Sequence, residues 1–212
     1  METKTSVLSG RRAQAARNNV RILDAARAVF VADPGAPISE VAKSAGVGIS
    51  ALYRRYASKE ALLRELCADG LSRYVAAAET ALADDRDPWT AFTDFMRRVV
   101  DADSHSLTLR LAGTFTPTEE LRREAEKAQQ LDLRLVERTK ATGALRADLV
   151  ADDLSFVFEQ VAAVRVGDEA RTRQLRHRYL ALQLDALHSP SRTSLPGPAP
   201  SWDEVSERWE TP

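Results

Sequence analysis

The sequence is poor in the residues that build disulfide frameworks and membrane spans. Its 212 residues contain one cysteine, Cys67, so no disulfide can form within the chain, as is usual in a reducing compartment. No apolar run approaches the roughly 18 residues that a membrane helix needs. The N-terminus also lacks the positive-then-apolar pattern of a signal peptide. These absences predict a cytoplasmic protein.

Catalytic and metal-binding motifs are missing as well. The sequence has no HExxH, no phosphate-cradling GxxxxGK[ST] and no GxSxG. The three histidines are scattered, without the spacing of metal ligands: His105, His177 and His188. We therefore expect no enzyme activity, no metal and no other cofactor.

Alternating apolar and polar residues, the pattern of strands, are absent over any length, and we find no internal repeat. Apolar residues instead recur at steps of three and four, as in "ILDAARAVF" (22–30), so the fold class is predicted to be all-α. A chain that is 44% hydrophobic and 29% charged can bury a core and stay soluble. The expected organisation is a flexible arm (1–16), a small helical domain (17–63), a larger helical body (64–188) and a Pro/Ser-rich tail (189–212), either docked or flexible.

Positive charge is concentrated near the N-terminus. Residues 1–60 contain ten Lys or Arg against five Asp or Glu, whereas the remaining residues contain twenty against twenty-six. A basic first quarter on an acidic body indicates that the first part meets a polyanion. The arginines of the arm, Arg11, Arg12 and Arg17, either add salt-dependent affinity for DNA or lie in a disordered tail.

Helix boundaries follow from caps and breakers. "DPGAP" (33–37) ends the first helix, which we expect to begin near Asn18. Ser39 is placed as the N-cap of the next, and Gly46 as its left-handed terminator. Further predicted starts are Ser58, Asp87 before Pro88, the capping box "TPTE" (116–119), Asp153 and Asp168.

The stretch "PISEVAKSAGVGISALYRRYASKEALL" (37–63) reads as two short helices joined by a glycine turn. A two-turn helix is marginal alone, so both need the helix at 18–31 as support. The inward residues should be Val41, Ala42, Ala45, Val47 and Leu52, packed on Ile22, Ala26 and Phe30. This is the helix-turn-helix pattern, whose second helix enters the major groove.

That second helix and its flanks supply the candidate DNA contacts. Small residues at its N-terminal end allow close approach to base edges, and the tyrosine and arginines after them can reach phosphates or guanine. Lys59 lies in the first turn of the following helix, where its ammonium and the helix amides can face a phosphate. The candidates from this reading are Gly48, Ile49, Ser50, Ala51, Tyr53, Arg54, Arg55 and Lys59.

Residues 18 to about 66 resemble the DNA-binding domain of the TetR (tetracycline-repressor-like) transcriptional regulators. The resemblance rests on Ile22, Ala26, Phe30, Ile38, Val41, Ala42, Ala45, Gly46, Val47, Leu52, Tyr53, Tyr56, Lys59, Glu60 and Leu62. It implies a homodimer with a DNA-binding head, an effector pocket in the body, and dimerisation through the last two helices. Tyr53 and Lys59 fall at family positions that contact phosphates. Glu40 departs from the family pattern, which leaves Ser39 to make the phosphate contact at the start of its helix.

Positions in the body are harder to assign, because core packing and ligand contact both require apolar residues. A helical body can leave a cavity for an apolar ligand. Arg134 is the polar candidate for orienting it, although an exposed arginine is the simpler reading. The candidate ligand-binding residues are Phe92, Met96, Leu109, Phe115, Leu131, Arg134 and Phe158.

The last two expected helices, 153–165 and 168–187, are apolar on more than one stripe. A helix at the surface needs only one. We therefore expect them to form a four-helix dimer interface with a second copy. The candidate interface residues are Leu154, Val157, Val161, Leu180, Leu184 and Leu187.

Together these patterns predict a ligand-responsive regulator, a repressor of a palindromic operator that a small apolar effector releases. Its expected partners are double-stranded DNA, a second copy and the effector, with no membrane. The alternative is a constitutive or architectural DNA-binding protein without an effector. The sequence does not specify the operator, the regulated genes, the effector, repression against activation, or the role of the tail.

Overall fold

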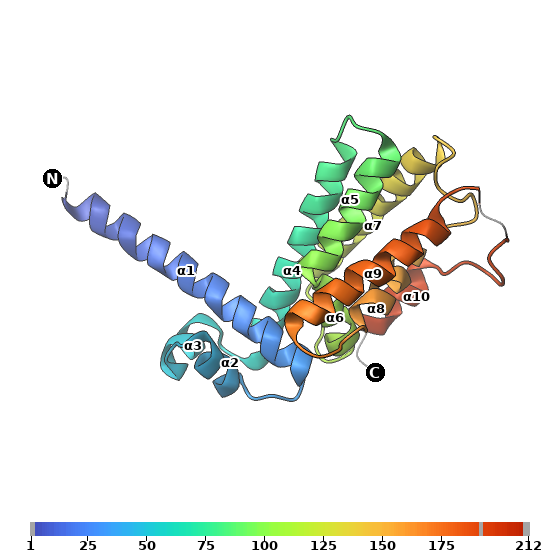
Figure 1. Ribbon diagram of the computed structural model, residues 1–212. Coiled ribbons are helices and arrows are strands. Elements are labelled where there is room, and N and C mark those ends of the chain that lie inside the picture. Colours follow the sequence, from blue (N-terminus) through green and yellow to red (C-terminus); the bar gives the residue numbers. More distant parts are fainter. Residues whose placement is uncertain (1–2, 191–192, 210–212) are drawn as a thin grey trace. The chain divides into compact units, whose positions relative to one another are not determined.

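The computed structural model describes residues 3–190 and 193–209, and the side chains of residues 3–16, 108 and 109 lie outside that description. Apart from an isolated bridge between Leu145 and His188, the described residues contain no β-structure, which confirms the all-α fold class. No helix in the described ranges is long and apolar enough to cross a bilayer. The elements (Figure 1) are α1 (Thr3–Ala32), α2 (Ile38–Ala45), α3 (Ile49–Arg55), α4 (Lys59–Leu82), α5 (Pro88–Ala102), α6 (Ser104–Leu111), α7 (Glu119–Lys140), α8 (Asp153–Ala162), α9 (Glu169–Leu187), α10 (Trp202–Ser206) and the 3₁₀ turn η1 (Glu207–Trp209).

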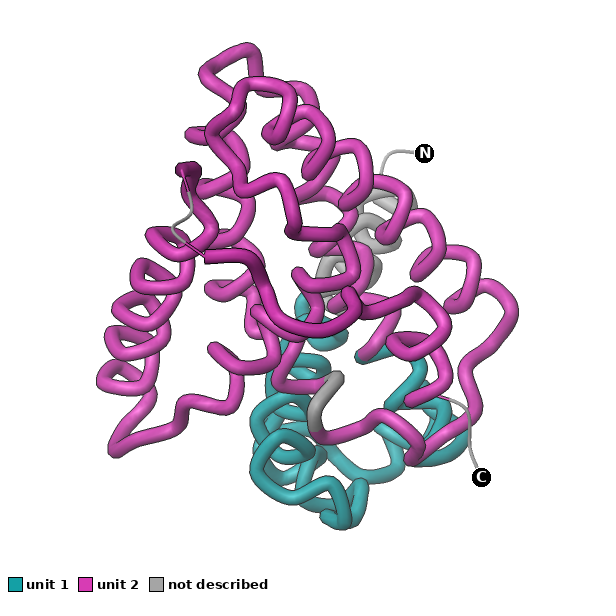
Figure 2. The backbone as a smooth tube through the Cα atoms, turned by 90° about the vertical axis from the view of Figure 1, so that its right-hand side faces the viewer, with its two compact units in different colours: residues 1–66 teal, residues 67–212 magenta. Residues whose placement is uncertain are grey.

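The chain divides into two compact units, residues 1–66 and 67–212, with the division inside α4 (Figure 2). We call the first unit the head and the second the body. α1 begins at Thr3 and not near Asn18, so residues 3–16, expected to be an arm, continue the helix. The physical reason is that this stretch contains no proline, and the single Gly10 costs only about 1 kcal/mol in a helix.

Several expected caps are present, and two are shifted. The Ser58 hydroxyl accepts from the Ala61 amide at 3.0 Å, and Asp87 caps α5 by accepting from Thr90. α2 begins one residue before Ser39, so Pro37 and not Ser39 is its N-cap. The cap of α7 is Thr118 and not Thr116, because Thr118 accepts from the Leu121 amide at 3.2 Å. α6 was not expected, and the positive φ of 51° at Asp103 separates it from α5.

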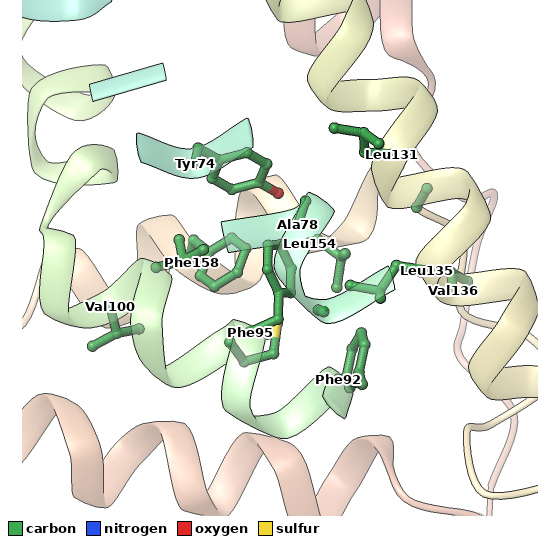
Figure 3. Packing of buried hydrophobic residues seen from close by; sticks show 14 of the residues in the cluster. Tyr74, Ala78, Phe92, Phe95, Val100, Leu131, Leu135, Val136, Leu154 and Phe158 are labelled. Atoms are coloured by element: carbon green, nitrogen blue, oxygen red, sulfur yellow. The ribbon is translucent and has the colours of Figure 1, made fainter. Parts of the chain in front are cut away.

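The core of the body contains a cluster of aromatic rings. Tyr74 of α4 meets Phe95 of α5 edge-to-face at 5.4 Å, and both rings pack edge-on against Phe158 of α8 at 6.0 Å (Figure 3). Each buried ring of this kind contributes about 2 kcal/mol or more by leaving water. The cluster continues through Leu131 and Leu135 on α7 and through Leu180 and Leu184 on α9, so it joins five helices.

A buried arginine joins the ends of three helices in the body. Arg176 of α9, 7% exposed, pairs with Asp103 at 2.6 Å and donates to Ser106 and to the Ala162 and Val164 carbonyls. These carbonyls lie at the end of α8, where helices leave acceptors unsatisfied. A guanidinium has enough donors for all these partners, and their contacts fix the turn between α8 and α9.

Candidate DNA-binding head and ligand cavity

The head is built as the sequence predicts, around the apolar face of α1. Ile22, Ala26 and Phe30 are buried, as are the expected partners Val41, Ala42, Ala45 and Leu52, while Val47 is half-buried. Gly46 ends α2 with φ 63°, a left-handed conformation that glycine adopts without strain. The Arg21 guanidinium reinforces the turn by donating to the Ala45 carbonyl at 2.7 Å.

The outer side of α3 is exposed and carries most of the candidate DNA contacts. Ile49 is 40% exposed and Tyr53 51% exposed, although a buried position is usual for large apolar side chains. Arg55 is partly immobilised, since it donates to Asn19 of α1 at 3.1 Å, and the Tyr56 hydroxyl donates to the same oxygen. The exposed candidates are Ser39, Gly48, Ile49, Ser50, Ala51, Tyr53, Arg54 and Arg55.

Lys59, like Arg55, is already engaged by other groups of the head. Its Nζ donates to the Pro34 carbonyl at 2.7 Å and lies 5.1 Å from the centre of the Phe30 ring. Tyr56 is buried, so it packs in the head and does not present its ring to a ligand. An ammonium has three N–H donors, so Lys59 can also donate to a phosphate that approaches beside Pro34.

The body contains a cavity of about 320 Å³. It lies among α4, α6, the N-terminal half of α7, the start of α8 and the C-terminal segment. Its walls are formed by Cys67, Gly70, Leu71, Tyr74, Ser104, His105, Leu107, Pro117, Leu121, Arg122, Ala125, Glu126, Ala128, Gln129, Asp132, Ala151, Asp152, Ser155, Trp202, Val205, Ser206 and Trp209. A volume of this size is within the range of small-molecule sites.

The cavity wall differs from the expected one. Phe92, Met96, Leu131 and Phe158 pack in the core of the body, because the helices bury these faces against one another. Phe115 is also buried, with its ring against that of Trp209 at 5.9 Å. Arg134 is exposed and lines a second pocket together with Leu131. The side chain of Leu109 lies outside the described part, so its role stays a prediction.

Two of the polar groups in the cavity wall, Asp132 and His105, have pKa values shifted toward their neutral forms. Asp132 is 8% exposed, and burial raises the pKa of its carboxyl to about 8, against the opposing effect of a hydrogen bond from Tyr74. Burial likewise lowers the pKa of His105 to about 4, with a smaller effect from the Arg208 guanidinium. At pH 7 the cavity wall therefore contains a neutral imidazole and a mostly protonated carboxyl. Within the described ranges, no group of three His, Cys, Asp or Glu side chains is placed to hold a metal.

The sequence contained a signal for Asp132 that we did not use. Asp132 stands four residues after Ala128 and four before Val136, on the apolar face of α7. A charged residue inside such a stripe marks either a buried partner or a ligand site. Trp202 and Trp209 were a second signal, since large aromatic rings in an otherwise polar tail point to a docked segment.

The expected dimer residues are buried inside one copy of the chain. Leu154, Val161, Leu180 and Leu184 are between 0% and 5% exposed, so they belong to the core of the body and not to a surface. Leu187 is buried as well, and Val157 is half-buried against the same core. The stripe that stays open on α9 lies on another face: Leu175 is half-buried, Tyr179 and Leu182 are 45% and 56% exposed, and Ala186 is exposed.

Comparisons with known proteins agree with this geometry. Residues 22–66 match the model of the bacterial regulatory proteins of the tetR family. The chain is 36% identical over 101 residues to the HTH-type transcriptional repressor LfrR of Mycolicibacterium smegmatis. That match covers 47% of this chain and 49% of the repressor, about half the length of each.

Solved structures share the fold over most of the chain. A TetR transcription regulatory protein from Mycobacterium vanbaalenii is 28% identical with a TM-score of 0.57, covering 84% of this chain and 98% of its own. The TetR-like regulator LfrR from Mycobacterium smegmatis, solved in complex with proflavine, is 21% identical with a TM-score of 0.65. That match covers 85% of this chain and 99% of the LfrR chain.

Proposed function

The chain belongs to the TetR family of bacterial regulatory proteins, and on that premise we propose that it is a DNA-binding transcriptional regulator that acts as a repressor. One observation carries the proposal: the exposed side of α3, with Tyr53, Arg54 and Arg55, follows directly on the left-handed turn at Gly46. A short helix held by a rigid turn can enter a major groove, with its arginines near phosphates or guanine. The protein acts in the cytoplasm and without catalysis.

A twofold dimer follows from the apolar stripe of α9. Leu175, Tyr179, Leu182 and Ala186 recur at steps of four, three and four, so they lie along one face of the helix. Exposed large apolar side chains in such a row are typical of an interface. A twofold dimer presents two α3 helices to a palindromic operator, with half-sites about 34–36 Å apart or slightly more.

The cavity supports response to a small effector with a largely apolar body. A ligand shifts operator affinity only if it binds one arrangement of the two heads better than the other. The LfrR structure is a complex with proflavine, which favours the same use of the body here. The alternative, a constitutive or architectural protein without an effector, is less favoured because the body contains a cavity with a buried polar wall.

The decisive experiment is selection of bound fragments from a random DNA pool by the purified full-length protein at physiological salt. We expect a palindromic consensus. Salt-sensitive binding without a consensus would support the architectural alternative instead. Absence of any DNA binding by the folded protein would refute the regulator.

Three variants then separate the roles of individual side chains. Tyr53→Phe removes a phosphate contact and should weaken binding to every sequence, whereas Arg54→Ala should relax preference at one position of the consensus, at a cost of about 1–3 kcal/mol there. Arg123→Ala, at an exposed position of α7 in the body, is the control and should leave binding unchanged. Equal losses of Arg54→Ala on all sequences would refute its base-reading role.

A further inference from the structure

The cavity wall contains a buried carboxyl with one unused oxygen. The Tyr74 hydroxyl donates to Oδ2 of Asp132 at 2.7 Å, while Oδ1 has no hydrogen-bond partner within the described residues. Buried polar atoms without partners are rare, because each costs about 1–3 kcal/mol in lost hydration. A residue of this kind in a cavity wall is explained if a ligand supplies the missing partner.

Acidic side chains outnumber basic ones in the cavity wall. Glu126 and Asp152 also line the cavity, and Arg122 is the one guanidinium among its described lining residues. Burial raises the pKa of Asp152, the neighbouring Asp153 charge raises it further, and a hydrogen bond with Gln129 acts in the opposite direction. Three carboxyls against one guanidinium favour a positively charged occupant over a neutral or negative one.

The C-terminal segment adds aromatic side chains to the cavity wall. Trp202 and Trp209 line the cavity, from a helix of five residues and the turn after it. Helices this short are unstable alone, so contacts with the body must keep the segment in place. Arg208 makes these contacts: it pairs with Glu159 at 2.7 Å and lies 5.7 Å from the centre of the Phe156 ring.

From this arrangement we propose that the cavity binds a flat organic cation, with the Asp132 carboxylate as its charge partner and the indoles of Trp202 and Trp209 as its cover. A desolvated cation gains both from an ion pair and from the faces of aromatic rings. The C-terminal segment is therefore part of the ligand site. That this cation is the effector rests on the proposed function, while its binding to the cavity does not.

The test measures binding of two flat probes of the same shape to the purified full-length protein, without DNA, by calorimetry at pH 8. One probe is 10-methylacridinium, which carries a fixed positive charge, and the other is acridine, which is neutral at this pH. We expect the cation to bind at least about tenfold more tightly, the scale of a desolvated charge interaction. Equal affinity for the two probes, or binding of neither, overturns the proposal.

Variants test which residues cause the preference for the cationic probe over the neutral one. Asp132→Asn keeps the shape of the side chain and should reduce the preference for the cation about tenfold or more, with acridine affinity nearly unchanged. Glu137→Gln, an exposed position on the same helix, should change neither affinity. If Asp132→Asn is folded by circular dichroism and still prefers the cation, Asp132 is not the charge partner and the proposal fails.

The role of the C-terminal segment has its own readout. In a Trp89→Phe variant the remaining tryptophans are Trp202 and Trp209, so all indole emission comes from the cavity wall. We expect 10-methylacridinium to quench this emission. The double variant Trp202→Leu, Trp209→Leu should lower the affinity for the cation about threefold or more. Unchanged emission at saturation overturns the assignment of the segment to the site.

Operator binding with and without the cation distinguishes this inference from the proposed function. Loss of operator affinity on addition of the cation, absent in Asp132→Asn, supports both. If the cation binds through Asp132 but leaves operator affinity unchanged, the proposed site is supported and the cation is not the effector. A protein without a consensus operator that still prefers the cation refutes the proposed function alone.

Discussion

Tyr74 on α4 donates a hydrogen bond of 2.7 Å to the Asp132 carboxyl on α7, 58 positions further along the chain. Both groups are buried, and the pKa of each is raised, chiefly by loss of water around its charged form. The hydrogen bond acts in the opposite direction on Asp132, because it stabilises the carboxylate. The pair therefore places a carboxyl with a pKa near neutral pH inside a largely apolar body.

Stability should therefore depend on pH through Asp132. The pKa of its carboxyl is about 8 in the folded protein and near the ordinary value of 3.8 when unfolded, so the folded state binds the extra proton between these values. The contribution of Asp132 to the free energy of unfolding is greatest below about pH 4. It is lost as the pH rises to about 8, with a slope approaching 1.4 kcal/mol per pH unit. Asp132→Asn lacks this loss, so in urea unfolding its stability relative to wild type should grow from pH 5 to 8. A difference that stays constant over this range contradicts the prediction.

Removal of the buried guanidinium should weaken the body. Arg176→Met removes the cation paired with Asp103 and the guanidinium that donates to the carbonyls at the end of α8, and we expect a loss of about 3 kcal/mol in urea unfolding. Arg173→Met is the matched control on the same helix, because its pair with Glu169 is exposed and contributes about 0.5 kcal/mol or less. Similar small losses for both variants would show that the Arg176 contacts do not stabilise the fold.

The turn of the head should not accept a side chain at Gly46. Gly46→Ala forces a φ of 63° on alanine and places Cβ 3.0 Å from Arg21 Nη2, so we expect a loss of about 1–2 kcal/mol in thermal or urea unfolding. Gly48→Ala, two residues later, has φ −66° and no atom within 4 Å of the added Cβ. It should cost much less, and equal costs at the two positions would contradict the strain argument.

Dimerisation should depend on the open stripe of α9. Leu182→Glu places a charge at a position that is 56% exposed in one copy, so it should spare the fold and prevent pairing. Light scattering should then give the mass of one chain, 23.4 kDa, against twice that value for the wild type. Val166→Glu, 54% exposed outside the stripe, is the control and should remain dimeric. A dimeric Leu182→Glu protein would place the interface elsewhere.

The sequence by itself determined the fold class, the order of the main helices and the three-helix head. Local rules suffice there: "DPGAP" must end a helix, Gly46 must allow a left-handed turn, and short helices need the apolar face of α1. The exposed candidates on α3 follow from the same register, because a helix that buries Leu52 must turn Ile49 and Tyr53 outward.

Only the tertiary structure decided which apolar positions of the body are core, cavity or open surface. Phe92 and Leu71 carry the same hydrophobic signal, yet one is buried in the core and the other lines the cavity. The same holds for Leu180 and Leu182 on α9, the first buried and the second exposed. Periodicity identifies an apolar face but not its partner, because the partner depends on how distant helices pack. For that reason the meeting of Tyr74, Asp132 and Trp209 at one cavity could be read only from the folded chain.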